Sequence, residues 1–217
     1  MITLSDKGLE NRTEWKEKGY ELPEFDRKKA MAATKENPFW VHFGAGNLFR
    51  AFQANVVQKL LNKGVLDRGL IAVEGFDYEI IEKMYRPHDD LSILVTLKAD
   101  GNVEKTVVGS ILESCVLDSE NGAEFQRLRE IFAKDSLQMA TFTITEKGYS
   151  LADGKGETLS SVEADYKAGP EKAMSYIGKV VSLLYTRYQA GKKPIAMVSM
   201  DNCSHNGDKL YVAVTAF

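Results

Sequence analysis

A glycine-containing segment in this sequence has the residue types and spacing that suit binding of a phosphate group. Gly44-Ala45-Gly46-Asn47-Leu48-Phe49-Arg50 directly follows a short aromatic and β-branched run over 39–43. Glycine at 44 permits a tight turn, and glycine at 46 lets a pyrophosphate approach the backbone at the start of a helix. Arg50 would reach a phosphate from the first helical turn. Phe49 stands where a third glycine would complete the dinucleotide fingerprint, so a purely structural turn is the alternative.

An acidic residue follows the next apolar run. Glu74 comes immediately after 70–73, and a carboxylate at this point of a dinucleotide fold accepts hydrogen bonds from the adenosine ribose and repels a 2′-phosphate. It lies 28 positions after Gly46, farther than the usual spacing of about 20 because the intervening helix is long. Asp77 competes for the same role. An exposed loop acid without a ligand is the alternative.

Two further polar clusters follow later apolar runs. In the first, alternation places Thr141, Thr143 and Thr145 on one face of a predicted strand. The second is the segment 199–208, in which an asparagine amide would stabilise the charge developing on a carbonyl oxygen. A cap and turn before the last helix is the alternative for this second cluster. This cluster also contains one cysteine and one histidine, but no further ligand residues stand at the spacing of a metal site, so we expect no metal.

These clusters need a framework of alternating strands and helices. Apolar runs predict buried strands over 39–43, 70–73, 137–145 and 195–199. Three- and four-residue periodicity predicts helices over 47–63, 77–86, 124–134, 170–189 and from 206 onward. Between them, 91–98 and 103–117 are predicted as antiparallel strands joined at Asp100-Gly101, and 150–169 as a loop. The pattern predicts an α/β doubly wound sheet with an antiparallel insertion, in which ligands bind at the carboxyl ends of the strands.

Composition limits the possible partners. The 217 residues carry 28 Lys and Arg against 31 Asp and Glu, a net charge of −3, which argues against binding to the nucleic-acid backbone. No apolar run approaches the roughly 20 residues that cross a bilayer, so no membrane partner is expected. The polar N-terminus does not resemble a signal peptide, and two cysteines form no disulfide framework. We therefore expect a cytoplasmic protein.

The chain is predicted to have two parts. Residues 1–38 are mostly polar, with one amphipathic stretch at Asp26–Thr34, and we interpret them as an N-terminal arm over the surface of the domain. A mainly disordered tail is the alternative. Residues 39–217 form the predicted nucleotide-binding domain, whose last helix is apolar up to Phe217 and looks truncated.

Taken together, the motifs resemble those of the mannitol dehydrogenase family, the polyol-specific long-chain dehydrogenases. The resemblance rests on Phe39–Ala54, on Thr143–Tyr149, and on Ser199–Asn202 followed by His205–Asp208. Pro23–Arg27 also looks like the family's approach to its first strand. The motifs stand in family order across nearly the whole chain, and Phe49 in place of the third glycine fits the family pattern.

The resemblance implies a Rossmann-like fold and NAD-dependent interconversion of a sugar alcohol or aldonate with its ketose or ketouronate. Fructuronate and mannonate are favoured as the substrate pair over fructose and mannitol. Pyrophosphate would be held by Phe43, Gly44, Ala45, Gly46, Asn47, Leu48, Phe49 and Arg50. Glu74 would bind the adenosine ribose. Thr145, Glu146 and Lys147 would lie near the nicotinamide, and Asp201 and Asn202 would be the catalytic residues of this chain.

One departure from the family concerns its catalytic lysine. The family carries a helical C-terminal domain whose Lys-x4-Asn-x2-His motif supplies that lysine. Here Asn202 and His205 keep the Asn-x2-His spacing, but position 197 is Met. We therefore expect the cofactor-binding portion of a dehydrogenase that lacks the helical domain and is poorly active alone. A non-catalytic NAD-binding or regulatory module is the main alternative, and an S-adenosylmethionine methyltransferase is a further one.

Overall fold

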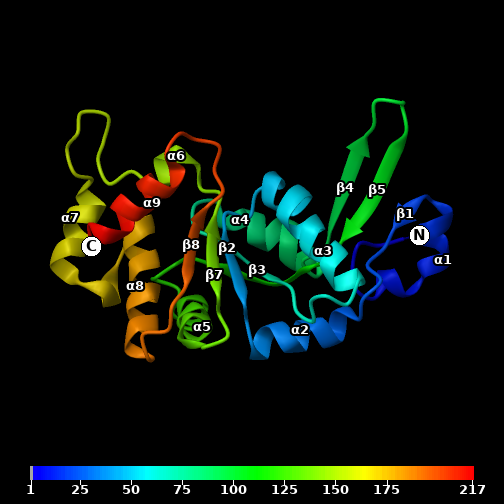
Figure 1. Ribbon diagram of the computed structural model, residues 1–217, viewed down its shortest axis with the longest axis horizontal. Helices are drawn as coiled ribbons and strands as arrows, with labels where there is room; N and C mark the ends of the chain where they lie inside the picture. The colour runs from blue at the N-terminus through cyan, green and yellow to red at the C-terminus, as the bar shows by residue number, and fades with distance from the viewer. Residues whose placement is uncertain (1) are drawn as a thin grey trace.

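The computed structural model describes residues 2–217 and is built around a five-stranded sheet (Figure 1). The strands stand in the order β6-β3-β2-β7-β8, and every neighbouring pair is parallel. Their bounds are β2 Trp40–Phe43, β3 Leu70–Glu74, β6 Ile111–Val116, β7 Met139–Phe142 and β8 Ala196–Ser199. The predicted parallel sheet is confirmed.

Helices cover both faces of this sheet, because successive side chains of its buried strands point to opposite sides. One face packs against α5 (Gly122–Ala133), α8 (Tyr176–Gln189) and α9 (Asn206–Thr215). The other packs against a helix that starts at Asn47, passes through the π-helical turn η2 (Phe49–Gln53) and continues as α3 (Ala54–Asn62). It also packs against α4 (Tyr78–Ile80) and the π-helical η3 (Ile81–Tyr85), which is followed by a short 3-10 turn, η4 (Arg86–His88). The predicted doubly wound fold is therefore confirmed.

The predicted strand over 103–117 is wrong as one element. Val103–Val108 forms β5, which pairs antiparallel with β4 (Ser92–Leu97), whereas Ile111–Val116 is β6 of the main sheet. The buried side chain of Gln58 holds the chain at the break between them: it accepts from the Gly109 N–H at 2.6 Å and donates to the Val107 carbonyl at 2.9 Å. Because these backbone groups bond to a side chain, neither sheet continues through this point.

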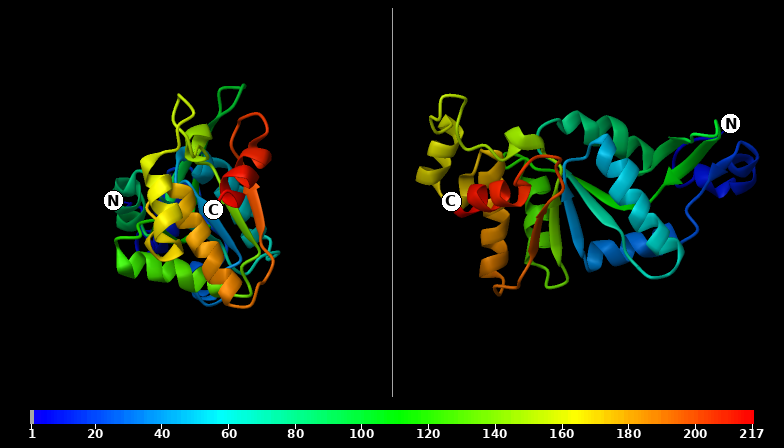
Figure 2. Two further views of the ribbon diagram at one scale, coloured as in Figure 1. Left: turned by 90° about the vertical axis from the view of Figure 1, so that its left-hand side faces the viewer. Right: turned by 45° about the horizontal axis from the view of Figure 1, so that its top comes forward.

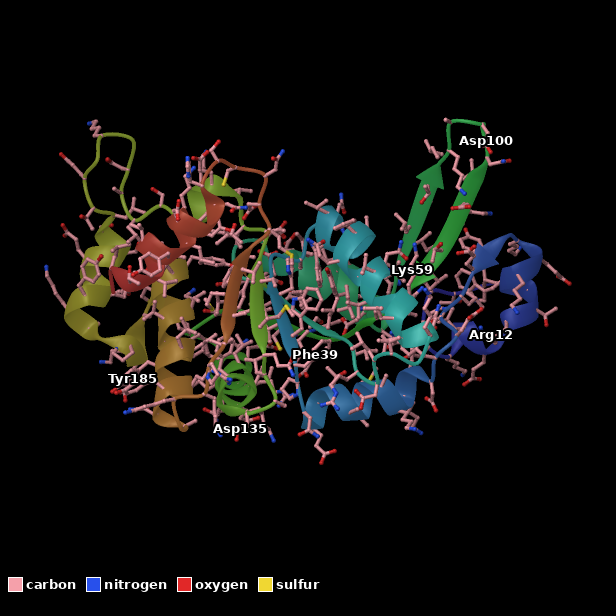
Figure 3. The ribbon with its side chains drawn as sticks, viewed as in Figure 1. Arg12, Phe39, Lys59, Asp100, Asp135 and Tyr185 are labelled. Atoms are coloured by element: carbon pink, nitrogen blue, oxygen red, sulfur yellow. The ribbon has the colours of Figure 1, made fainter. Side chains whose placement is uncertain are left out.

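The antiparallel hairpin belongs to a separate three-stranded sheet of order β1-β5-β4. It extends beyond the body of the molecule, with Asp100 at its tip (Figure 3). β1 (Tyr20–Glu21) comes from the N-terminal segment and runs parallel to β5. The hairpin and the N-terminal segments therefore lie at one end of the molecule, and α7 (Ser160–Ala168) and α9 lie at the other (Figure 2).

The N-terminal arm is folded, so the alternative of a disordered tail is wrong. It forms η1 (Gly8–Glu10), α1 (Arg12–Glu17) and α2 (Arg27–Glu36) in addition to β1. Trp15 is buried in a small core that consists of Leu9, Trp15, Leu22, Leu91 and Val107. The arm therefore packs on the hairpin sheet through its own apolar side chains.

Three further boundaries differ from the predictions. The predicted strand over 137–145 ends at Phe142, and the loop predicted over 150–169 contains α7 (Ser160–Ala168). The helix predicted from 170 is preceded by η5 (Pro170–Lys172), and α8 itself starts only at Tyr176. Its start is set by the buried Asp165 carboxylate, which accepts from Met174 N–H at 2.7 Å and from Ser175 N–H at 2.9 Å. Within the described residues, no helix combines the length and the apolar character needed to cross a bilayer.

Candidate functional site

The predicted site residues gather at the carboxyl edge of the main sheet. β2 lies between β3 and β7, so the chain reaches β3 on one side of β2 and later reaches β7 on the other. This reversal is the topological switch point, where open α/β sheets bind ligands in the crevice beyond the strand ends. The glycine segment directly after β2 therefore stands at the position where a ligand is expected.

The two glycines of this segment differ in their surroundings. Gly44 has φ +107°, a backbone conformation that favours glycine, and a Cβ placed there would overlap the Thr143 carbonyl oxygen. A Cβ at Gly46 would meet no described atom within 4 Å. Gly44 is thus needed for the fold of the turn, whereas the space beside Gly46 is open.

The helix after the glycine turn presents positive charge to this space. The first N–H groups of a helix that starts at Asn47 have no acceptor within the helix, and its N-terminus carries a partial positive charge. The Arg50 guanidinium donates to the Asn47 side-chain oxygen and lies 5.7 Å from the centre of the Tyr85 ring. The Arg50 Nε is buried and finds no hydrogen-bond partner among the described residues. This arrangement suits an anionic ligand.

Glu74 is already engaged by the protein backbone. Its side chain is buried, with 6% of the residue exposed. One carboxylate oxygen accepts from the Ala45 N–H at 2.9 Å, and the other accepts from Gly75 N–H at 3.0 Å, Phe76 N–H at 2.9 Å and Asp77 N–H at 3.4 Å. The competing acid, Asp77, is exposed. The carboxylate of Glu74 therefore connects the turn after β2 to the turn after β3, and Asp77 is the accessible acid.

Thr141 and Thr143 share a partner that sequence reasoning missed. The buried His42 on β2 contacts the Thr141 hydroxyl through Nδ1 at 2.6 Å and the Thr143 hydroxyl through Nε2 at 2.9 Å. Its ring stacks on Phe49 with centroids 4.0 Å apart. Burial lowers the pKa of His42 to about 3, so the ring is neutral at ordinary pH and does not act as an acid. Thr145 does not share their face, because it has φ +63° and begins α6 (Thr145–Gly148).

Asp201 connects the loops after β7 and β8. Its carboxylate accepts from the Ile144 N–H at 2.9 Å, the Thr145 N–H at 3.0 Å and the Tyr149 hydroxyl at 2.5 Å. The Tyr149 hydroxyl is also 2.8 Å from the Ser199 hydroxyl. Burial and the neighbouring Asp201 carboxylate raise the pKa of Tyr149, so this hydroxyl stays protonated and donates a hydrogen bond to Asp201. Asp201 lies at the predicted site, with its oxygens bonded to the chain.

The neighbouring Asn202 is free for a ligand. Its side chain is exposed and forms no hydrogen bond within the described part of the chain. The turn that carries it is held by Asn206, whose amide donates to the Asp201 carbonyl at 2.8 Å. No group of three or more metal-ligating side chains occurs within residues 2–217.

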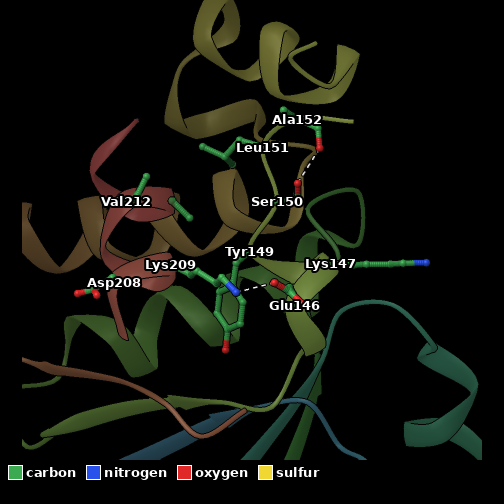
Figure 4. A pocket seen from close by; sticks show the side chains of 10 residues that line it. Glu146, Lys147, Tyr149, Ser150, Leu151, Ala152, Asp208, Lys209 and Val212 are labelled. Atoms are coloured by element: carbon green, nitrogen blue, oxygen red, sulfur yellow. Dashed lines mark hydrogen bonds and ion pairs between the residues drawn. The ribbon is translucent and has the colours of Figure 1, made fainter. Parts of the chain in front are cut away.

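Glu146 and Lys147 line a pocket of about 660 Å³ between α6 and α9 (Figure 4). Glu146 forms an ion pair with Lys209 at 2.5 Å, which joins the two helices. Lys147 extends away from this ion pair and is exposed (Figure 4). A second pocket, of about 300 Å³, opens between the turn after β3 and the start of α8, where the rings of Phe76 and Tyr176 stack 4.6 Å apart.

Sequence reasoning missed three tyrosines of this region. Tyr149 stands in the motif after β7, but the sequence assigned it no partner. Tyr85 donates its hydroxyl to the Ala45 carbonyl at 2.9 Å, and the Tyr176 hydroxyl is buried without a partner among the described residues. No local signal identifies the last two, because their neighbours lie far away in the sequence.

Comparison with known proteins agrees with this geometry. The family described as "Mannitol dehydrogenase Rossmann domain" matches residues 39–216. The D-mannonate oxidoreductase of Thermotoga maritima is 46% identical over 213 residues, which cover 98% of this chain and 39% of that protein.

Two solved structures resemble the fold. A substrate-free D-sorbitol dehydrogenase superposes with a TM-score of 0.79 at 26% identity, covering 99% of this chain and 42% of the other. The Pseudomonas fluorescens mannitol 2-dehydrogenase in ternary complex with NAD and D-mannitol gives 0.74 at 28% identity, covering 91% and 39%. This chain therefore spans about two fifths of the length of these proteins.

Proposed function

The chain belongs to the mannitol dehydrogenase family, and on that premise we propose that it binds NAD along the carboxyl edge of its sheet, as the nucleotide-binding part of a polyol or aldonate oxidoreductase. The observation that carries the proposal is the turn at Gly46: it is open to a ligand, lies at a helix N-terminus and stands at the switch point of the sheet. The mannitol 2-dehydrogenase that it resembles was solved with NAD bound.

The pyrophosphate would be held by the N–H groups that follow Ala45, with the Arg50 guanidinium as counter-charge. The Ala45 N–H itself is not available, because Glu74 accepts its hydrogen bond. We assign the ribose hydroxyls to Asp77 in place of Glu74, since its carboxylate is exposed. Phe43 is buried in the core and supports the turn from below through its stacking on Phe142, with centroids 4.8 Å apart.

The nicotinamide would lie toward the loops after β7 and β8. When bound, this ring accepts or donates the hydride. The Asn202 amide is free to donate to the substrate oxygen, and the loop over 145–147 is bonded to the neighbouring Asp201 through the Thr145 N–H. Asp201 would keep that loop in place without touching the reacting atoms, because three donors already occupy its oxygens.

Proton transfer from the substrate hydroxyl needs a base with a suitable pKa. His42 does not supply it, since burial lowers its pKa to about 3, which makes the ring a very weak base, and both of its nitrogens contact threonine hydroxyls. Lys209 is paired with Glu146. We propose that a lysine of the family's helical domain supplies this function and that these 217 residues alone turn over substrate slowly.

The resemblance to D-mannonate oxidoreductase favours mannonate and fructuronate as substrates. A cytoplasmic location remains part of the proposal, and Cys115 and Cys203 are both free thiols.

The test is a titration of the chain with NADH, NADPH and S-adenosylmethionine, followed by calorimetry. Gly46→Ala should leave folding unchanged, because the added methyl group meets no atom of the chain. It should weaken NADH binding roughly 10- to 100-fold, since displacing the phosphate costs one or two charge-assisted hydrogen bonds.

Gly122→Ala is the matched control, because a Cβ there also meets no neighbour and the residue opens α5, which follows β6, two strands away from β2. It should bind NADH like the wild-type chain. If wild type shows no NADH binding, or if Gly46→Ala binds NADH as tightly as Gly122→Ala, the proposed cofactor site is wrong. Binding of S-adenosylmethionine in place of NADH would support the methyltransferase alternative.

A further inference from the structure

The two peptide groups that meet at Ala45, in the glycine turn, are each held by a buried side chain. Ala45 is fully buried. Its N–H donates to a carboxylate oxygen of Glu74 at 2.9 Å, and its carbonyl accepts from the hydroxyl of Tyr85 at 2.9 Å. The N–H belongs to the peptide group between Gly44 and Ala45, and the carbonyl belongs to the one between Ala45 and Gly46, so neither peptide group can rotate without breaking its contact.

The two side chains that hold these peptide groups belong to one continuous segment of the chain. The second carboxylate oxygen of Glu74 accepts from the three N–H groups of residues 75–77, which lead into α4. That helix continues through the π-helical η3, and its last residue is Tyr85. The segment from Glu74 to Tyr85 therefore contacts the glycine turn at both of its ends, through the two side chains, and forms one helix between them.

The Tyr85 hydroxyl is suited only to donate in this position. The residue is 1% exposed, and burial raises the pKa of its hydroxyl well above the ordinary value for tyrosine, so the proton stays in place. The ring also lies beneath the Arg50 guanidinium. One side chain thus contacts both the turn and the cation beside it.

We propose that Glu74 and Tyr85 are positioning residues of the phosphate site: they fix the two peptide groups that flank Ala45, so that the N–H groups of Gly46 and Asn47 are aligned for a diphosphate before it binds. This inference rests on the proposed function. Neither residue touches the ligand. Their contribution is to remove the cost of ordering the turn on binding, which is the usual source of affinity in a preorganised site.

The test compares two tyrosines of the same helix. Tyr85→Phe removes only the hydroxyl that holds the turn. Tyr78→Phe is the matched control, because the Tyr78 hydroxyl donates to the Leu117 carbonyl at 3.2 Å and does not contact the turn. ADP-ribose, which contains the diphosphate, and adenosine, which does not, are titrated into both variants and into wild type.

Loss of the Tyr85 hydrogen bond should weaken binding of ADP-ribose about three- to tenfold, the range for one neutral hydrogen bond. Adenosine affinity should stay within about twofold, and Tyr78→Phe should change neither. Equal losses for both ligands in Tyr85→Phe would show a general structural defect and overturn the proposal. So would ADP-ribose binding as tight as that of wild type.

Hydrogen exchange on the ligand-free chain gives a second readout. The N–H groups of residues 44–50 should exchange faster in Tyr85→Phe than in Tyr78→Phe, because only the first variant frees the turn. Equal exchange in both variants would contradict the proposal. If wild type binds neither NADH nor ADP-ribose, the proposed function fails. If wild type binds both and Tyr85→Phe binds them equally well, only the positioning role fails.

Discussion

Replacing Asp201 tests whether this carboxylate holds two loops together or acts in chemistry. Asp201→Ala removes the acceptor of three hydrogen bonds, from Ile144 N–H, Thr145 N–H and the Tyr149 hydroxyl. The loop after β7 would lose three of the hydrogen bonds that join it to the loop after β8. We expect a large loss of stability, which a residue that only contacts substrate would not produce.

The magnitude follows from what each donor can do after the substitution. Ile144 is 4% exposed, so its N–H would be left buried without an acceptor, at a cost of about 1–3 kcal/mol. Thr145 is exposed, and water can replace the carboxylate there. Tyr149 keeps its contact with the Ser199 hydroxyl but loses a bond to a charged acceptor, worth about 1.5 kcal/mol. The free energy of unfolding should therefore fall by roughly 2.5–4.5 kcal/mol.

Urea denaturation followed by circular dichroism measures this change. Asp201→Asn should lose about half as much, because its amide keeps one acceptor oxygen. Asp208→Asn is the control, because Asp208 is an acid of the same region that pairs with His205, and the two side chains are 82% and 81% exposed. Substitution of such a surface residue changes the free energy of unfolding by no more than about 0.5 kcal/mol. An Asp201→Ala chain that unfolds at the wild-type urea concentration would refute the proposed connection between the loops.

Three further predictions concern stability. Because burial lowers the pKa of His42 from 6.5 to about 3, the unfolded chain binds this proton more readily. The free energy of unfolding should therefore fall by up to about 5 kcal/mol as pH drops from 6.5 toward 3, a loss that urea melts of His42→Gln should lack. Arg187→Lys should lower the free energy of unfolding by about 3 kcal/mol or more in urea melts, because the buried guanidinium donates to five carbonyls and a lysine reaches fewer. A variant as stable as the wild type would contradict this. Gly44→Ala should lower the thermal midpoint, whereas Gly46→Ala should not, and equal midpoints would argue against the described turn.

Much of the fold was predictable from local patterns. The run at 39–43, the glycine turn and the apolar helix after it correctly predicted a strand, a turn and a helix. Gly64, at the end of that helix, has φ +67°, as a left-handed cap requires. These elements follow from periodicity and from backbone preferences, which act between residues a few positions apart.

The sequence also indicated which residues come together, because residues that follow parallel strands must meet at one edge of a sheet. It did not reveal which of them are free. Glu74 and Asp201 are acids after strands, and both suit a ligand by type. In the structure, both carboxylates are bonded to N–H groups, and Asp77 and Asn202 are exposed.

Only tertiary packing decided these partnerships. The Ala45–Glu74 bond spans 29 positions of the sequence, the Ile144–Asp201 bond spans 57, and the His42–Thr141 contact spans 99. Whether a carboxylate faces solvent or a backbone N–H depends on how two loops approach each other, which no periodicity encodes. Residue types and strand ends therefore determined where the candidate site is expected, while the burial of each polar group against distant backbone determined which side chains remain available for a ligand.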